Sequence, residues 1–110
     1  MNLKIQLVNT NKEYEDILDI RKLVFVEEQN VPIDIEIEHE NDSNHVICYY
    51  ENIAVGTGRW RKTNFGIKLE RFAVLNEYRG LGIGRQIVNF ILAEISSNNT
   101  IYLHAQEAVV

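Results

Sequence analysis

Several features that would place the chain in a specialised class are scarce or missing. Its 110 residues include one cysteine, Cys48, which excludes an internal disulfide and is typical of a reducing cytoplasm. No apolar run approaches the ~20 residues that a membrane-spanning helix needs, and Met1-Asn2-Leu3-Lys4 has no signal-peptide pattern. There is also no repeat, low-complexity tract or internal linker. These absences predict a single cytoplasmic domain over residues 1–110, with no membrane as partner.

Net charge and composition narrow the class of protein further. The net charge of −5 argues against a nucleic-acid partner and favours a cationic one. A hydrophobic content of 45% with 25% charged residues is typical of a soluble globular domain. At this length the domain is near the small end of what can bury a sufficient core.

The spacing of apolar residues predicts a mixed α/β fold. Thr10 and Glu13 have the spacing of a capping box that begins a helix, and Glu51-Asn52 has the character of a tight hairpin turn. Gly56 and Gly58 indicate a bulge or a close backbone approach within a strand. The order is β-α-β-β-β-α-β, with strands at 3–8, 45–50, 53–61, 68–75 and 101–105 and helices at 12–28 and 83–95.

A glycine-rich stretch between the fourth strand and the second helix is the strongest functional signal. It reads Arg79-Gly80-Leu81-Gly82-Ile83-Gly84. Glycines let the backbone approach an anion closely, and a helix N-terminus presents unpaired N–H groups at the positive end of its dipole. Strand, loop and helix together predict a phosphate site. The alternative is a glycine-rich turn that only links strand to helix.

The spacing distinguishes among phosphate loops. No Gly-Lys-Ser/Thr closes the stretch, so it is not a P-loop, and its G-x-G-x-G pattern is a poor dinucleotide fingerprint. It fits Arg/Gln-x-x-Gly-x-Gly/Ala, the pyrophosphate signature of GNAT-family N-acetyltransferases. The string 70–84 resembles that family's strand-to-helix junction, and 104–106 resembles the end of its fifth strand. Residues 24–29, the acidic stretch 33–42 and His45 together resemble an uncharacterised bacterial subgroup of the family.

The resemblance implies an acyl-CoA N-acyltransferase fold and a reaction. Acetyl-CoA would be the co-substrate, with no metal, and its acetyl group would pass to a primary amine of a small molecule or peptide by direct attack. Main-chain groups of Phe72, Ala73 and Val74 would pair with the pantetheine arm, and an N–H near Ala73 or Val74 would polarise the thioester carbonyl. The pyrophosphate would bind the loop amides of Arg79, Gly80, Leu81, Gly82, Ile83, Gly84 and Arg85.

Glu70 is the first candidate for the catalytic base. It lies two residues before Phe72, which predicts that the two side chains share one side of the strand. Partial burial there would raise the pKa of its carboxyl. The alternative is that Glu70 pairs with a nearby arginine on the sheet. Glu36 and Glu38 are second candidates. For the acid, the family uses a tyrosine in a later helix, and spacing recommends neither Tyr78 nor Tyr102.

Two further segments have alternative interpretations. Residues 33–42 alternate isoleucine with acidic residues, which predicts either a solvated edge or an acidic wall that attracts a cationic amine. Glu36, Glu38, His39 and His45 do not have the spacing of a metal site. Arg59, Trp60 and Arg61 end a strand, where packing is the commoner explanation and ligand contact the alternative.

Competing functions follow from the same residues. The alternative to an enzyme is a non-catalytic CoA-binding module, and after it a structural or interaction domain with an unused loop. The resemblance also implies a helix and strands beyond the fifth strand, so the fold is expected to be C-terminally incomplete. We therefore expect either a homo-oligomer formed through the 101–105 edge or a piece of a longer protein. In either case we expect the transfer activity of the 110-residue chain to be weak or absent.

Overall fold

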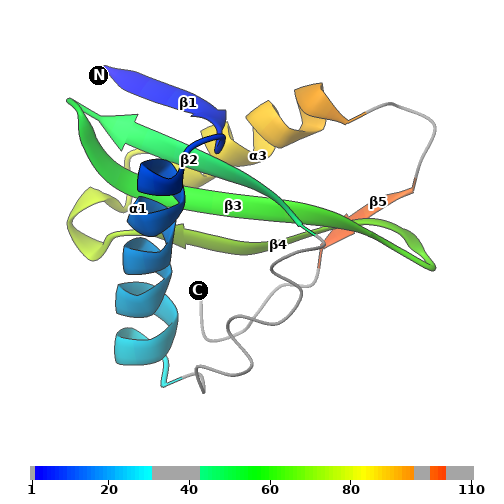
Figure 1. Cartoon of the computed structure of the whole chain (residues 1–110), viewed down its shortest axis with the longest axis horizontal. Helices are drawn as coiled ribbons and strands as arrows, with labels where there is room; N and C mark the ends of the chain where they lie inside the picture. Colours follow the sequence, from blue (N-terminus) through cyan, green and yellow to red (C-terminus); the bar gives the residue numbers. More distant parts are fainter. Residues whose placement is uncertain (1, 31–42, 96–99, 104–110) are drawn as a thin grey trace.

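A mixed sheet between two helical layers forms the molecule (Figure 1). The computed structural model describes residues 2–30, 43–95 and 100–103. Its elements are β1 (Leu3–Leu7), α1 (Asn11–Arg21), η1 (Lys22–Glu28), β2 (Asn44–Tyr50), β3 (Ile53–Thr63), β4 (Gly66–Val74), η3 (Asn76–Tyr78), α3 (Ile83–Glu94) and β5 (Ile101–Leu103). This order confirms the predicted β-α-β-β-β-α-β arrangement, with the short helical segments η1 and η3 added.

The sheet follows the chain, in the order β1-β2-β3-β4-β5. Neighbours from β1 to β4 are antiparallel, and β4 pairs with β5 in parallel through residues 67–69. The β2–β3 turn has positive φ at Glu51 (49°) and Asn52 (69°), as a tight hairpin turn requires. The β3–β4 hairpin extends beyond its predicted ends, so most of the turn expected at 62–66 is strand. Of the predicted strand at 101–105, residues 104 and 105 lie outside the described part.

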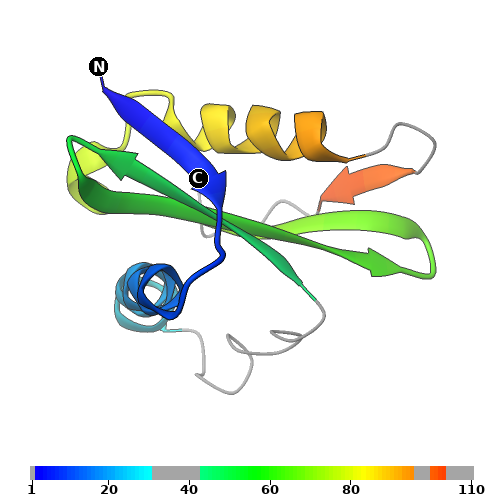
Figure 2. The same ribbon diagram turned by 45° about the horizontal axis from the view of Figure 1, so that its top comes forward.

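Each face of the sheet packs on one helix (Figure 2). We call these the α1 face and the α3 face. The core on the α3 face is larger, and its buried residues are Val46, Cys48, Val55, Ile67, Leu69, Ile83, Ile87 and Ile91. The core on the α1 face consists of Ile20, Val24, Phe25 and Ala73. Cys48 is a buried packing residue, as predicted, and burial raises the pKa of its thiol to about 11.

The first helical segment begins as predicted but does not stay an α-helix. Thr10 Oγ1 accepts from Glu13 N–H and the Glu13 carboxylate accepts from Thr10 N–H, which completes the capping box. The expected single helix over 12–28 is an α-helix only to Arg21, and a π-helical segment follows. Ile20 and Phe25 are five residues apart and belong to the same small core as Ala73. This spacing suits the i→i+5 geometry of a π-helix, which is often found at functional sites.

Two glycines in β3 allow close contact across the α3 face. A methyl group at Gly58 would lie 2.8 Å from the Phe72 ring, and one at Gly56 would lie 3.0 Å from Ile87 Cδ1. The close backbone approach predicted for this strand is therefore confirmed. Within the described ranges, no helix has the length and apolarity needed to span a bilayer.

Candidate active site

The glycine-rich loop has the geometry of an anion site. Gly80 and Gly82 have φ of 85° and 80°, and Gly82 caps α3 in a left-handed conformation. The first hydrogen bond of the helix runs from Gln86 N–H to Gly82 O. The N–H groups of the residues just before Gln86 therefore have no acceptor within the helix. A methyl group at Gly80, Gly82 or Gly84 would meet no other atom within 4 Å. The loop therefore presents its main chain to open space.

Arg79 connects this loop to two other elements. Its Nε donates to Val74 O (2.9 Å), and its two terminal nitrogens each lie 3.0 Å from a carboxylate oxygen of Glu28, at the end of η1. Both side chains are about two-fifths exposed. The positive charge predicted for a bound phosphate is thus present beside the loop, but Glu28 shares it.

A β-bulge in β4 decides which residues reach the α1 face. Thr57 pairs with Ala73 whereas Arg59 pairs with Glu70, so β4 has one extra residue here, and Arg71 has a φ of 57°. Phe72 packs on the α3 face and Ala73 on the α1 face. Glu70 pairs with Arg59, whose strand neighbours Gly58 and Trp60 belong to the α3 face. The prediction that Glu70 and Phe72 share one side is therefore wrong, because the bulge inverts the alternation between them.

Among the described residues, no strand pairs with the C-terminal half of β4 on the side away from β3, and we call this its open edge. Pairing with β5 covers residues 67–69 only, as far as the described strands extend. Leu75 N–H donates to Val55 O (2.9 Å) on β3. Because N–H groups alternate along a strand, Ala73 N–H also points to β3, whereas the N–H groups of Phe72 and Val74 point to the open edge. Of the two candidate donors for a thioester carbonyl, Val74 has the required direction.

Glu70 is surrounded by cations. Its Oε2 lies 2.7 Å from Arg59 Nη2 and 2.8 Å from Arg61 Nε, and its Oε1 lies 3.3 Å from Lys68 Nζ. Burial alone would raise the pKa of this carboxyl, but its hydrogen bonds and charge interactions with Arg61 and Arg59 outweigh burial and lower the pKa to about 2. The expectation of a raised pKa is wrong. The alternative, pairing with a nearby arginine, is confirmed.

The remaining predicted residues are dispersed. Glu36, Glu38 and His39 lie outside the described residues, as does the whole of 33–42. The His45 ring contacts Tyr14 edge-on at 5.4 Å between centroids, and Tyr78 contacts Tyr50 at 5.7 Å. Within the described ranges, no three His, Cys, Asp or Glu side chains gather as a metal site would require.

Sequence reasoning did not single out Lys68 or Glu28, and for Arg59 and Arg61 it favoured packing at a strand end over ligand contact. The signal was present, because Arg59 and Arg61 alternate in one predicted strand as Lys68 and Glu70 do in the next. An antiparallel register would have placed these four side chains on one face. Glu28 gave no such signal, since its partner Arg79 is 51 residues away.

Comparisons with known proteins agree with this geometry. Residues 12–109 match the family model described as Acetyltransferase (GNAT) family. The chain is 42% identical over 84 residues to the uncharacterized N-acetyltransferase YjcF of Bacillus subtilis, covering 74% of this chain and 59% of that protein. It spans 59 to 62% of the length of the curated relatives considered.

Solved structures show the same fold. An acyl-CoA N-acyltransferase from Pseudomonas aeruginosa superposes with a TM-score of 0.84 at 22% identity, covering 98% of this chain and 82% of that one. Arabidopsis thaliana Naa50, in complex with the bisubstrate analogue CoA-Ac-MVNAL, superposes with a TM-score of 0.72 at 23% identity, covering 97% and 74%.

Proposed function

The chain belongs to the acetyltransferase (GNAT) family, and from that premise we propose that it transfers the acetyl group of acetyl-CoA to a primary amine of a small molecule or peptide. The observation that carries the proposal is the open edge of β4 leading into a glycine loop and the N-terminus of α3. The alternative is a non-catalytic module that binds CoA.

In this proposal the cofactor binds mainly to backbone. The pyrophosphate accepts hydrogen bonds from the N–H groups of the loop and first helical turn, from Gly80 to Arg85, and pairs with the side chain of Arg79, whose own N–H donates to Asn76 O (3.3 Å). The pantetheine arm lies along the open edge at Phe72, Ala73 and Val74. Val74 N–H then donates to the thioester carbonyl and stabilises the oxyanion that forms on attack. The solved complex of Naa50 with a CoA-peptide analogue supports this assignment at the level of the fold.

The bulge puts Glu70 and Ala73 on the α1 face, and both are largely buried there. A general base works best when its pKa is near the working pH, and a carboxylate with a pKa of about 2 accepts a proton weakly. We therefore assign Glu70 a positioning role, holding Arg59 and Arg61, and assign removal of the amine proton to solvent. The single, buried cysteine supports a cytoplasmic location.

One experiment distinguishes the enzyme from the non-catalytic CoA-binding module. Acetyl-CoA binding is measured by calorimetry, and turnover is measured over a panel of small amines and peptides. Binding with turnover supports the enzyme. Binding with no turnover of any amine supports the non-catalytic module, and no binding would overturn both.

The pH dependence tests the assignment of Glu70. For Glu70→Gln we expect the ratio of mutant to wild-type kcat/KM to be flat across pH. A mutant deficit that shrinks as pH approaches the pKa of the amine would restore Glu70 as base, because the substrate then deprotonates unaided.

A further inference from the structure

The glycine-rich loop is joined to η1 by one ion pair. Glu28 is the last residue of η1, and its two carboxylate oxygens lie 3.0 Å from the two terminal nitrogens of Arg79, the first residue of the loop. Arginine binds a phosphate group through the same pair of parallel N–H···O bonds. The Glu28 carboxylate therefore occupies the edge of the guanidinium that a pyrophosphate would bind.

The other hydrogen bonds of Arg79 leave little of its guanidinium for a second anion. Nε donates to Val74 O at the end of β4 (2.9 Å), and Nη1 also lies 3.5 Å from Asn76 Oδ1. With the two bonds to Glu28, these contacts use one N–H of Nε, two of Nη1 and one of Nη2. An anion that binds Arg79 through two terminal N–H groups must therefore displace the carboxylate.

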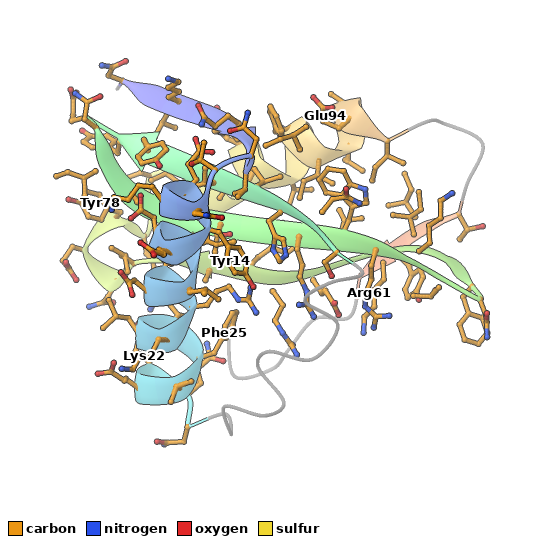
Figure 3. The ribbon with its side chains drawn as sticks, in the orientation of Figure 1. Tyr14, Lys22, Phe25, Arg61, Tyr78 and Glu94 are labelled. Atoms are coloured by element: carbon orange, nitrogen blue, oxygen red, sulfur yellow. The ribbon has the colours of Figure 1, made fainter. Side chains whose placement is uncertain are left out.

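The segment that carries Glu28 also covers the strand that leads into the loop. Val24 and Phe25 are buried in the small core that includes Ala73, and η1 contacts β4. Figure 3 shows Phe25 and Tyr78, which lies just before the first residue of the loop, at the same end of the molecule, away from Arg61. Ala73 is only 3% exposed. In the free protein, η1 and its neighbours therefore close this face of β4.

The C-terminal end of η1 is attached less firmly than its middle. Its buried residues are Val24 and Phe25, whereas Glu27 is exposed and the Glu28 side chain is 39% exposed. Among the described residues, the side-chain hydrogen bonds and ion pairs of residues 26–29 all run to Arg79. A helix end with few buried contacts opens at a low cost in free energy. Loss of this one pair should therefore loosen the last turn of η1.

We propose that Glu28 is an internal competitor for Arg79, and that the pyrophosphate of acetyl-CoA displaces its carboxylate and so releases the last turn of η1 from the glycine loop. The inference rests on the proposed acetyl-CoA site and adds a contact that makes cofactor binding and the position of η1 depend on each other. Such a coupling is reciprocal. A change that frees η1 without removing Arg79 should strengthen cofactor binding, and the cofactor should free η1.

The affinity test compares two ligands and two carboxylates. Acetyl-CoA and acetyl-pantetheine, which lacks the pyrophosphate, are titrated by calorimetry at low salt into the wild type, Glu28→Gln and Glu27→Gln. Glu27 is the matched control, because it is the neighbouring exposed carboxylate and makes no ion pair with any described residue. Glu28→Gln should tighten acetyl-CoA binding about fivefold. Acetyl-pantetheine binding to either variant, and acetyl-CoA binding to Glu27→Gln, should change by about twofold or less.

Hydrogen exchange of the backbone amides measures the release of η1 directly. Ligand binding ordinarily slows exchange, because it stabilises the folded state. Here acetyl-CoA should speed exchange in the last turn of η1 about fivefold, and acetyl-pantetheine should not. Arg79→Gln removes the other partner of the pair, so it should show the fast exchange without any ligand and also weaken acetyl-CoA binding. Glu28→Gln and Arg79→Gln should therefore agree in exchange and differ in affinity.

Two results would overturn the competition. One is an equal effect of Glu28→Gln and Glu27→Gln on acetyl-CoA affinity, and the other is η1 exchange that acetyl-CoA slows or leaves unchanged. The proposed function fails separately. Acetyl-CoA binding that releases η1, with no turnover of any amine, would leave the competition standing and overturn the proposed transfer. Turnover without release of η1 would do the reverse.

Discussion

At the scale of single residues, Arg71 determines the composition of the site. Its φ of 57° belongs to a conformation that residues other than glycine rarely adopt. The bulge it forms turns Glu70 toward the α1 face and leaves Phe72 on the α3 face. Such strain is usually maintained where it contributes to function. Here it places a charged cluster and an open strand edge next to each other.

The ion pairs of Glu70 predict a pH-dependent stability. Its pKa is about 2 in the folded state against an ordinary 4.5, so the stabilisation is complete above about pH 5 and is lost as pH falls toward 2. Glu70→Gln leaves its cations without their carboxylate and should lower the free energy of unfolding by roughly 3–5 kcal/mol at neutral pH. Denaturant unfolding from pH 7 to pH 2 should show this difference shrinking below pH 5.

The control is Glu94→Gln, an exposed carboxylate at the end of α3, which should change stability by about 0.5 kcal/mol or less. A Glu70→Gln deficit that grew on acidification would contradict the assigned pKa.

Substitution of Gly82 tests whether the backbone of the loop binds an anion. Its φ of 80° strains any β-branched residue, so Gly82→Val should lower stability by about 1–3 kcal/mol and weaken acetyl-CoA binding about tenfold or more. Gly84 has no positive φ and open space around it, so Gly84→Ala should not lower the melting temperature. A Gly82→Val protein that melts like the wild type and keeps its acetyl-CoA affinity would argue against a backbone anion site.

At the scale of elements, the site lies where three of them converge. The π-helical η1 brings Phe25 onto Ala73 and brings Glu28 to Arg79, so one segment contacts both the strand and the loop. On the opposite face, β3 uses glycines to let Phe72 and α3 approach. The open edge of β4 is therefore supported from both sides of the sheet, which keeps its N–H groups in place for a ligand.

The contact between Gly58 and Phe72 can be measured as a coupling free energy between substitutions at the two positions. A methyl group at position 58 would lie 2.8 Å from two ring carbons of Phe72. Gly58→Ala should therefore destabilise the protein by about 1–3 kcal/mol through overpacking. In a Phe72→Leu background the same substitution should cost at least ~0.5 kcal/mol less. Purely additive effects in denaturant unfolding would show that the ring is not what excludes a side chain here.

The Glu28–Arg79 pair should oppose cofactor binding. Glu28→Gln removes a negative charge close to the proposed pyrophosphate site and releases Arg79 for the ligand. Because the pair is partly exposed, stability should fall by no more than about 1 kcal/mol. Acetyl-CoA affinity at low salt should rise severalfold, and the gain should shrink as salt is added. Unchanged or weaker binding in Glu28→Gln would mean that Arg79 serves only the protein's own structure.

At the scale of the whole molecule, a cofactor bound to the open edge and the glycine loop would stabilise the folded state, because it binds only the folded chain. Acetyl-CoA at about 100 times its Kd should add about 2.7 kcal/mol to the free energy of unfolding, or roughly 10 °C in melting temperature for a domain of this size. Acetyl-pantetheine, which lacks the pyrophosphate, should produce a much smaller shift. Equal shifts from both compounds would place the binding energy outside the glycine loop.

Local sequence determined the elements and the loop of this protein. Apolar periodicity, the Thr10–Glu13 capping box, the Glu51-Asn52 turn and the alternating glycines are short-range signals, since each acts within a few residues of the chain. They predicted the element order and the strand–loop–helix geometry, both of which the structure shows. The cofactor residues named from the sequence remain predictions, and of the three in β4 only Phe72 and Val74 direct their N–H groups away from β3.

Tertiary structure decided the orientation of the side chains in the candidate site. One extra residue in β4 inverts the alternation of all positions beyond it, and no local pattern marks that residue. The pKa of Glu70 depends on Arg59 and Arg61, which the β3–β4 register brings to it. Electrostatic interactions act through space between strands and not along the chain, so the sequence named Glu70 but only the packed sheet determined its charge and its neighbours.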